Sequence, residues 1–283
     1  MDRVSLIILT HNKKKYSRAC LESLLATEGL ELEVIVVDNG SGDGTRGLPE
    51  DIKAPFRQNG HRLRVRFNKE NVGCSTARNQ GLDMSTGRYC VFMDNDVMAV
   101  DGTWAEGLVA TLEEEPRAGI VGPKLIYPVS PHRIQCAGVG ISPNGRVKFR
   151  GRGERRDARG YNHRREVQCL ISACFLFPRA LYEEIGGLDE AFNPIEFEDF
   201  DFCYRAREAG WRCIYEPSVE MYHWESITSE GTRRLPNTYL IVKHGMLFKE
   251  RWHHMFEKED GPPDEACQWE PITMEGLEGK RTR

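Results

Sequence analysis

The sequence predicts an α/β protein whose central sheet is mostly parallel and covered by helices on both faces. Short apolar runs alternate with helical patterns along the first half of the 283 residues, as in successive strand–helix units. Polar residues also follow three of these runs, at Thr10, Asp38 and Asp94. Ligands of such sheets bind beyond the carboxyl ends of the strands, so these three residues indicate one shared crevice.

The first half carries the regular alternation. Runs of β-branched and aliphatic residues predict strands at 4–9, 32–37, 63–67 and 89–93. Amphipathic patterns predict helices at 14–27, 74–84 and 104–115. Pro116 stops the last of these helices.

The second half has shorter apolar runs, which proline and glycine interrupt. They predict strands at 120–127, 134–141, 146–149, 167–177, 212–215 and 219–222. Helices are expected at 179–185, 198–209 and 236–256. Gly186 and Gly210 follow the first two helices at the position where a left-handed residue commonly ends a helix.

Composition narrows the class of protein. The chain is 40% hydrophobic and 29% charged, which is typical of a globular protein, and its net charge of −4 argues against a surface that coats nucleic acid. We expect no signal peptide, and no apolar run approaches the ~20 residues that cross a membrane. The nine cysteines form no Cys-x-x-Cys pair, which favours reduced, buried thiols. We therefore expect a cytoplasmic protein, with peripheral membrane association as an open alternative.

Asp94 and Asp96 are the first candidates for a metal site. They follow the expected strand at 89–93, and alternate residues of an extended chain point to the same side. Carboxylates are preferred ligands of Mg²⁺ and Mn²⁺, which often share their coordination with substrate phosphates. The alternative is a chance triplet, because the chain contains 43 acidic residues.

A second acidic group stands at the expected start of the helix at 198–209. Glu196, Glu198, Asp199 and Asp201 alternate with phenylalanines, so the segment is expected at the edge of the core rather than on a solvated face. The field at a helix N-terminus favours ionised carboxylates by about 0.3–1 kcal/mol, as a proton acceptor requires. Simple N-capping by Glu198 or Asp199 is the structural alternative.

Six segments together resemble the family 2 glycosyltransferases with the GT-A fold, in particular rhamnosyltransferases of that family. They are residues 7–12, 36–45, 71–81, 93–96, 186–190 and 198–205, and the resemblance runs from about Val4 to His223. It implies a Rossmann-like mixed sheet flanked by helices. We expect a single GT-A catalytic domain over 1–256, with a nucleotide-binding half (1–118) and an acceptor-binding half (119–256). A polar C-terminal tail is expected over 257–283.

The resemblance also implies a nucleotide-sugar donor, UDP- or dTDP-linked. Asp38 would accept a hydrogen bond from the imide N–H of the base, an interaction that suits a carboxylate. Thr10 and Asn12 would line the base pocket, and Arg78 would lie near the base or the phosphates. The alternatives are a turn-forming role for Asp38 and a solvated helix position for Arg78.

The same resemblance assigns the metal and the base. Asp94 would lie by the ribose and the metal, Asp96 would bind Mn²⁺ or Mg²⁺ directly, and His223 would complete the metal shell. A lone histidine is also common in a core or on a surface, so that role stays open. Asp199, beside Glu198, would be the general base that takes a proton from the acceptor hydroxyl. One base and one leaving-group metal imply single displacement with inversion.

Two features depart from the family pattern or extend it. Processive relatives carry Gln-x-x-Arg-Trp, whereas this chain has Phe248 before Arg251 and Trp252, which predicts transfer of single sugars. The segment 146–165 contains nine lysines and arginines but only two acidic residues, and several glycines are scattered along it. It is either a mobile solvated loop or a flap near the acceptor side that binds phosphate, on the donor or on an anionic acceptor.

The sequence leaves the acceptor and the role of Glu196 open. A glycan, a lipid-linked sugar, a peptide and a modified nucleic-acid base are all possible acceptors. A sugar nucleotidyltransferase would require a glycine-rich loop after the first strand, where this chain has Thr10-His11-Asn12. A non-catalytic nucleotide-sugar-binding protein is the alternative from another class, and the acids at 94, 96, 198 and 199 argue against it.

Overall fold

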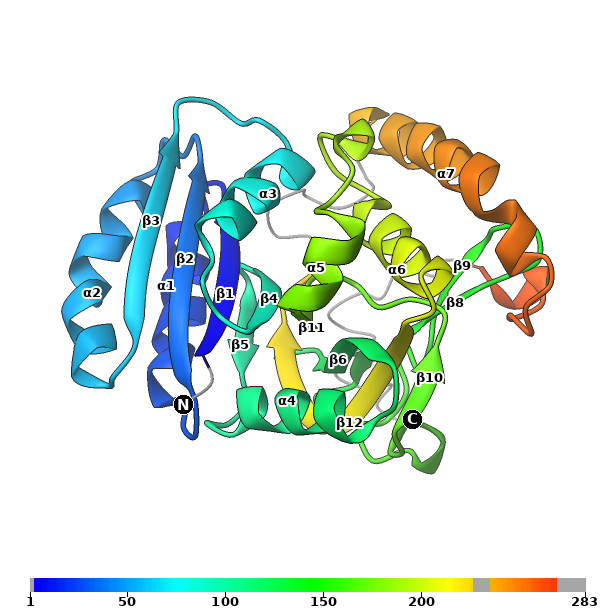
Figure 1. Ribbon diagram of the computed structural model, residues 1–283, viewed down its shortest axis with the longest axis horizontal. Helices are drawn as coiled ribbons and strands as arrows, with labels where there is room; N and C mark the ends of the chain where they lie inside the picture. The colour runs from blue at the N-terminus through cyan, green and yellow to red at the C-terminus, as the bar shows by residue number, and fades with distance from the viewer. Residues whose placement is uncertain (1–2, 226–234, 269–283) are drawn as a thin grey trace, which may run out of the picture.

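The computed structural model describes residues 3–225 and 235–268 (Figure 1). The strands of the main sheet are β1 (Arg3–Thr10), β2 (Glu31–Asn39), β3 (Arg62–Asn68), β4 (Tyr89–Asp94), β5 (Val97–Ala99), β6 (Ala118–Ile126), β7 (Ile134–Cys136), β10 (Arg165–Val167), β11 (Cys174–Pro178) and β12 (Arg212–His223). A small second sheet pairs β8 (Val139–Ile141) with β9 (Val147–Phe149).

The main sheet is mixed, with ten strands. Its order is β10–β12–β6–β11–β4–β1–β2–β3, while β5 pairs with β12 and β7 with β6. Strands β1 to β4 are parallel neighbours, and β12 runs parallel to β6. Strand β11 lies antiparallel between β4 and β6 and so joins the two parallel groups. The predicted mixed α/β sheet is confirmed.

The described residues form seven α-helices. They are α1 (Lys14–Ser23), α2 (Leu48–Gln58), α3 (Cys74–Met84), α4 (Trp104–Glu114), α5 (Arg179–Ile185), α6 (Glu198–Glu208) and α7 (Leu235–Phe256). Short 3₁₀ turns occur at η1 (Leu24–Ala26), η2 (Thr45–Gly47), η3 (Arg159–Tyr161), η4 (Glu190–Phe192) and η6 (Asp264–Ala266). None of the helices described is both long and apolar enough to pass through a bilayer.

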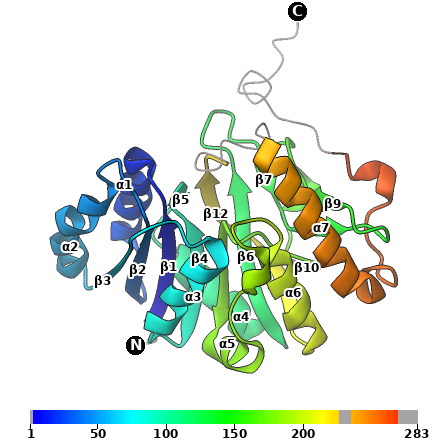
Figure 2. The ribbon, with the colours of Figure 1, turned by 90° about the horizontal axis from the view of Figure 1, so that it is seen from above.

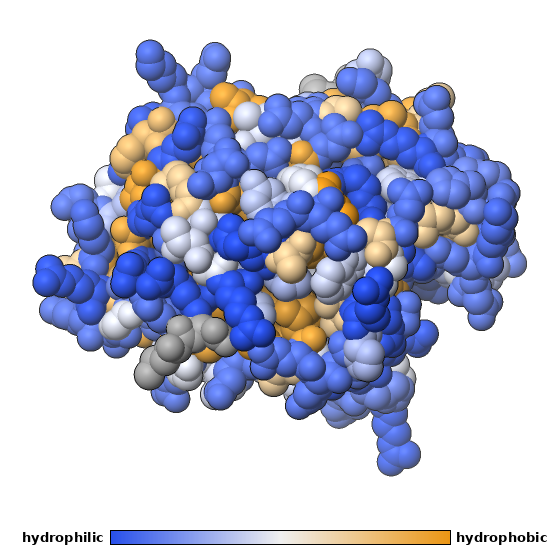
Figure 3. All heavy atoms as spheres, viewed as in Figure 1, coloured by the Kyte–Doolittle hydropathy of each residue, from blue (hydrophilic) through white to orange (hydrophobic). Residues whose placement is uncertain are grey.

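The helices divide between the two faces because strand residues alternate. Ile8 and Val36 contact Leu21 of α1 and Leu48 of α2 on one face of the sheet. The adjacent residue Ile7 points to the other face and contacts α3 at Gly81. Helices α5 and α6 lie on the α3 side, and α7 packs outside α6 (Figures 1 and 2). The face seen in Figure 3 is mostly hydrophilic, with hydrophobic residues in small separate groups.

Several predicted elements are wrong in their limits. The predicted strand at 134–141 divides at Gly138, whose φ of +87° turns the chain. The predicted strand at 167–177 also divides, since β10 pairs with β12 at one edge while β11 pairs with β4 in the interior. Conversely, the two strands expected at 212–215 and 219–222 form one strand, β12, with a bulge between Glu216 and Glu220.

Other elements were not predicted or extend further than expected. Helix α2 and strand β5 were not predicted from the sequence. Part of the expected tail packs on the body, because the Glu259 carboxylate accepts hydrogen bonds from Gln168 and Tyr204 at 2.6 and 3.1 Å. The rest of that tail, 269–283, lies outside the described residues. All nine cysteines are free thiols, and all but Cys267 are buried, as expected.

Candidate functional site

The carboxyl ends of β4 and β12 bring three potential metal ligands together. Asp94 ends β4, Asp96 follows it, and His223 ends β12. One ligand atom from each of the three lies within 4.8 Å of the others. The short strand β5 explains this meeting, because it leads from Asp96 straight into antiparallel pairing with β12 and places Val97 opposite His223. Two carboxylates and an imidazole are a donor set that suits Mn²⁺ and also Mg²⁺.

Gln135 orients the His223 ring. The Gln135 Oε1 atom lies 2.7 Å from His223 Nδ1, and His223 Nε2 lies 3.3 Å from Asp96 Oδ1. If Nδ1 carries the proton that Gln135 accepts, Nε2 presents its lone pair toward Asp96 and the ligand cluster. Burial would lower the pKa of His223, but the Asp96 carboxylate raises it above its usual value.

Arg78 connects the ligand cluster, which is Asp94, Asp96 and His223, to the acids of α6, Glu198 and Asp199. Its guanidinium is 2% exposed, donates to Asp94 Oδ1 at 2.5 Å and lies 3.6 Å from Glu198 Oε1. Ser172 also accepts hydrogen bonds from it through both its hydroxyl and its carbonyl oxygen. Burial opposes the charge, but the surrounding acidic groups raise the pKa of Arg78 above its usual value. The alternative of a solvated helix arginine is therefore wrong.

Asp199 is fixed by backbone donors rather than serving as a helix cap. Its Oδ2 accepts from Ser172 N at 3.0 Å and its Oδ1 from Phe200 N at 2.8 Å. The N-cap residue of α6 is Phe197, whose side chain makes no capping hydrogen bond. Glu198 and Asp199 lie inside the first turn, so the alternative that either is the N-cap is wrong. Burial and the Glu198 carboxylate raise the pKa of Asp199 well above that of an ordinary aspartate.

The segment before α6 is held in an uncommon backbone conformation. Glu196 and Phe197 both have positive φ, 84° and 71°, which side-chain-bearing residues rarely adopt. Tertiary contacts hold the segment, since Cys74 N donates to Pro194 O at 2.7 Å and His244 Nδ1 lies 2.8 Å from Ile195 O. Burial, with the Glu198 charge, raises the pKa of Glu196 to about 7.

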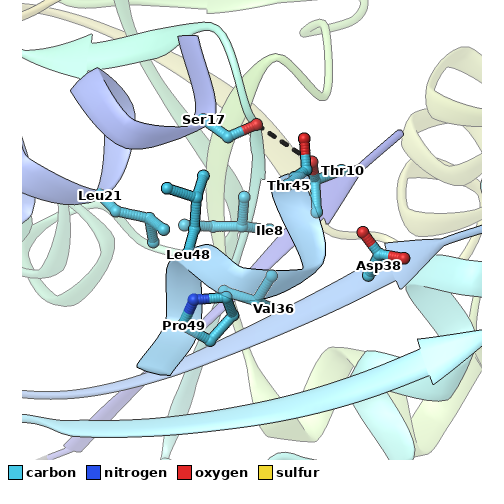
Figure 4. A pocket seen from close by; sticks show the side chains of 9 residues that line it. All are labelled: Ile8, Thr10, Ser17, Leu21, Val36, Asp38, Thr45, Leu48 and Pro49. Carbon is cyan, nitrogen blue, oxygen red and sulfur yellow. Dashed lines mark hydrogen bonds between the residues drawn. The ribbon is translucent and has the colours of Figure 1, made fainter. Parts of the chain in front are cut away.

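Asp38 borders a small pocket between β1, β2 and the start of α2 (Figure 4). The pocket measures about 10 Å³, and Figure 4 shows the polar residues Thr10, Thr45 and Asp38 gathered at one side of it. Asp38 Oδ1 accepts from Ser41 N at 3.0 Å, which is the turn-forming role considered above. Its Oδ2 is buried and has no hydrogen-bond partner among the described residues, so the carboxylate keeps one acceptor for a ligand.

Thr10 and Asn12 hold the neighbouring loops together. The Thr10 hydroxyl lies 3.0 Å from that of Ser17 at the pocket wall. Asn12 Oδ1 accepts from Gly42 N at 2.8 Å, and Asn12 N donates to Ser41 Oγ at 2.7 Å. Thr10 and Asp38 are thus brought together at the pocket, whereas Asn12 joins the loops after β1 and β2.

The basic segment 146–165 is not an unpaired flap. Glutamates of β12 and beyond bind three of its arginines: Arg164 lies 2.6 Å from Glu216, Arg152 lies 2.7 Å from Glu225, and Arg156 binds Glu220. The sequence could not show this compensation, because the glutamates stand more than 50 positions away from their arginines. The interpretation as a purely solvated loop is therefore wrong.

Sequence reasoning missed two residues of the site, Gln135 and Ser172. Each is a polar residue inside an otherwise apolar segment, Ile134-Gln135-Cys136 and Leu170 to Ala173. A buried polar side chain in such a setting requires a partner. That signal could have marked both positions, although it does not identify His223 or Arg78 as the partner.

Comparison with known proteins gives the family. Glycosyl transferase family 2 matches residues 5–186, which is more than half of the chain. Protein y4gI of Sinorhizobium fredii is 31% identical over 263 residues, 88% of this chain and 27% of that protein. An N-acetylglucosaminyl-diphospho-decaprenol L-rhamnosyltransferase of Mycobacterium tuberculosis is 27% identical over 86% of this chain and 82% of its own. The chain spans only 27%, 13% and 17% of three of the curated relatives that it matches.

Solved structures share the fold. GalNAc-T7 with UDP, GalNAc and Mn²⁺ superposes with a TM-score of 0.67 at 16% identity, over 91% of this chain and 50% of that one. The mannosyltransferase PcManGT of Pyrobaculum calidifontis, with GDP-Man and Mn²⁺, superposes with a TM-score of 0.60 at 20% identity. The superposition covers 90% of this chain and 71% of that one. The expected GT-A fold is confirmed by these neighbours. With this fold and the match over residues 5–186, the chain belongs to glycosyl transferase family 2 and its domain is that of a glycosyltransferase.

Proposed function

We propose that this protein is a metal-dependent, inverting glycosyltransferase that moves a single sugar from a UDP- or dTDP-sugar to an acceptor hydroxyl. The supporting observation is the continuous set of contacts from the ligand cluster to the acids of α6. Asp94 of the cluster binds Arg78, and Arg78 lies against Glu198, the neighbour of Asp199. These contacts link the three potential metal ligands to Asp199 through one buried arginine, which supports a metal ion and a proton acceptor acting in one site.

Asp94, Asp96 and His223 would hold the ion, Mn²⁺ or Mg²⁺. Such an ion, when bound, neutralises negative charge that builds on a departing nucleoside diphosphate. Gln135 would keep the His223 ring in the orientation that presents Nε2 to the site. The solved structures of GalNAc-T7 and PcManGT both contain Mn²⁺, which supports the choice of ion.

Asp199 would act as the general base. Burial and the Glu198 carboxylate raise its pKa well above the usual range, which makes it a stronger proton acceptor than an ordinary aspartate. The hydrogen bonds from Ser172 N and Phe200 N fix the carboxylate in place, so its position does not depend on the substrate. As Asp199 takes the proton, the acceptor oxygen would attack the anomeric carbon and the bond from that carbon to the nucleoside diphosphate would break. A single displacement of this kind, with no nucleophile from the protein, inverts the configuration of the sugar.

Asp38 would select the base of the donor. Its unpartnered Oδ2 atom suits an imide N–H, which uracil and thymine both carry. The pocket beside it is smaller than a pyrimidine ring, so the ring would lie at the opening of the pocket. TarS of S. aureus, in complex with UDP-GlcNAc in one of its solved structures, supports a uridine carrier, whereas PcManGT holds GDP-Man.

The acceptor belongs to glycan or glycoconjugate synthesis in this proposal. The rhamnosyltransferase of M. tuberculosis, whose name specifies a diphospho-decaprenol acceptor, supports a lipid-linked sugar and peripheral association with a cytoplasmic membrane surface. Transfer of one sugar at a time agrees with Phe248, which is fully buried against Tyr204 and Phe256 and offers no amide to an acceptor chain.

Calorimetric titration tests the donor and metal sites together. We expect UDP or dTDP to bind more tightly with Mn²⁺ than without, and GDP to bind weakly. In Asp96→Asn the effect of Mn²⁺ should fall by about tenfold or more, because a charged ligand is lost. Asp83→Asn, an exposed aspartate of α3, serves as the matched control and should behave as the unmodified protein. Equal nucleotide binding with and without Mn²⁺ would contradict the proposal.

A further inference from the structure

A second cavity lies outside the site described above. It measures about 590 Å³ and is lined by Lys124, Pro131, Arg133, Arg155, Arg156, Asp157, Asn162 and Glu220. None of these residues belongs to the Asp94, Asp96 and His223 cluster or to the acids of α6. The cavity combines β6 and β12 with residues of the basic segment 146–165 that the proposed function leaves unused.

The cavity and the metal-ligand cluster lie on opposite faces of the sheet. Glu220 and His223 are three residues apart on β12, and the strand pairs without a bulge over this stretch. An odd separation places the two side chains on opposite faces, about 10 Å apart along the strand. Tyr222 shares the face of Glu220, and its ring lies 5.1 Å from that of His132, next to the cavity residues Pro131 and Arg133.

The lining carries more positive than negative charge. Four of its side chains are cationic and two are carboxylates. Glu220 serves two cations at once, since Lys124 lies 3.0 Å from its Oε1 and Arg156 also binds it. Arg155 is satisfied by Asp157 through two hydrogen bonds, of 2.9 and 2.7 Å. Two positive charges therefore remain in excess.

The excess charge is fixed in position. Lys124 is 2% exposed and is held by Asn162 Oδ1 at 2.5 Å as well as by Glu220, so it cannot move into solvent. Arg133 donates from Nη1 to Gly153 O at 3.0 Å, and its Nε is buried without a hydrogen-bond partner among the described residues. The Lys124 ammonium also donates to Arg156 O, so its three N–H groups all have partners and it contributes fixed charge alone. The guanidinium groups favour a ligand whose oxygens accept charge-assisted hydrogen bonds.

We propose that this cavity is a second anion-binding site, which takes a phosphate or diphosphate group independently of the donor and its metal. The volume is sufficient for a diphosphate ester, because small-molecule sites typically measure about 300–1,000 Å³. A position on the other face of the sheet from His223 means that a ligand here does not compete with a nucleotide in the donor site. This proposal does not depend on the proposed glycosyl transfer.

Calorimetric titration with inorganic pyrophosphate in EDTA tests this site, because EDTA removes the metal through which the donor site would hold a diphosphate. We expect binding that weakens as salt increases. Arg133→Gln should weaken it about tenfold, while Arg57→Gln, an exposed arginine of α2, should leave it unchanged. Arg133→Lys keeps the charge but not the guanidinium geometry and should lose less affinity than Arg133→Gln, which separates loss of the site from loss of the fold.

The same titration with geranyl diphosphate identifies the source of the anion. Tighter binding than that of pyrophosphate supports the site and indicates a diphosphate attached to an apolar chain. Equal affinity supports the site and indicates that the phosphate groups alone are recognised. Absence of pyrophosphate binding at millimolar concentration in EDTA, or equal affinity in Arg133→Gln and Arg57→Gln, would overturn the proposal.

Discussion

The Asp199 carboxylate occupies a setting that opposes its ionisation. Helix position alone predicted an ionised acid, because a first-turn carboxylate is favoured by about 0.3–1 kcal/mol. Burial and the adjacent Glu198 carboxylate outweigh that effect, and they raise its pKa well above the usual range. Arg78 offsets part of this repulsion, since it lies 3.6 Å from Glu198 Oε1. The net result is a carboxyl group whose pKa is raised well above that of a surface aspartate.

The pH dependence of transfer follows from this balance. A general base acts only when deprotonated, so kcat/KM should fall as pH decreases through the pKa of Asp199 in the folded protein. Because that pKa is raised, the acid limb should lie well above the pKa of about 3.9 that an ordinary aspartate has. Asp199→Asn should lower kcat by about 10²–10⁴-fold and leave nucleotide affinity unchanged. Initial rates between pH 4 and 9 provide the measurement.

The variant Glu196→Gln identifies which carboxyl group causes the decrease in kcat/KM at low pH. The pKa of Glu196 is raised to about 7, so this side chain could also cause a decrease in rate at low pH. If Asp199 is the base, the acid limb persists in Glu196→Gln. A limb that disappears in this variant while Asp199→Asn keeps substantial activity would transfer the role to Glu196.

At the scale of elements, the apolar runs predicted strands β1 to β4 well, whereas the short strand β5 was missed and prolines concealed one helix. Helix α2 carries Pro49 in its first turn and Pro55 inside, and proline ordinarily argues against a helix interior. The division of 167–177 could not be predicted, because both parts are apolar and only the pairing partners of β10 and β11 distinguish them. Local pattern therefore predicts that a strand exists, while long-range pairing decides where it ends.

Helix α7 supports helix α6 through one buried carboxylate. Asp201 is fully buried and accepts hydrogen bonds from Trp252 Nε1 at 3.0 Å, Arg251 Nη1 at 3.2 Å and Arg205 Nε at 2.8 Å. Arg251 also binds Asp189 at 2.6 Å. The arginine and tryptophan that processive relatives share with this chain thus hold two elements together here.

Trp252→Phe tests this support. The change removes the indole N–H and leaves the buried Asp201 carboxylate with one donor fewer, so unfolding free energy should fall by about 1–3 kcal/mol. Trp211→Phe is the matched control, because the Trp211 indole donates to the Glu184 carboxylate at 2.8 Å in an exposed setting. Trp211→Phe should lower the unfolding free energy by less than about 0.5 kcal/mol. Urea unfolding measures both, and equal losses would show that Asp201 does not depend on the indole.

For the whole molecule, one sheet runs through both expected halves of the domain. The register of β1, β2 and β4 brings Thr10, Asp38 and Asp94 to a common edge, which the sequence predicted from the strand ends alone. The contribution of the second half was predictable only in part. His223 could be named as a candidate, but Gln135 and Ser172 meet the site through pairings between distant segments, namely β7 with β6 and the residues before β11 with α6.

The continuity of the sheet predicts that the two halves unfold together. Strand β11 of the second half pairs along five positions with β4 of the first, so separating the halves would expose an unpaired edge in the centre of the core. The buried thiols report on this directly, since Cys20 lies in the first half and Cys213 in the second and both are fully buried. Thiol labelling at increasing urea, followed by mass spectrometry, should modify both at the same urea concentration, whereas the partly exposed Cys267 should react without urea. Modification of Cys20 at a lower urea concentration than Cys213 would mean that the nucleotide-binding half opens by itself, and the single domain expected over 1–256 would then have to be divided.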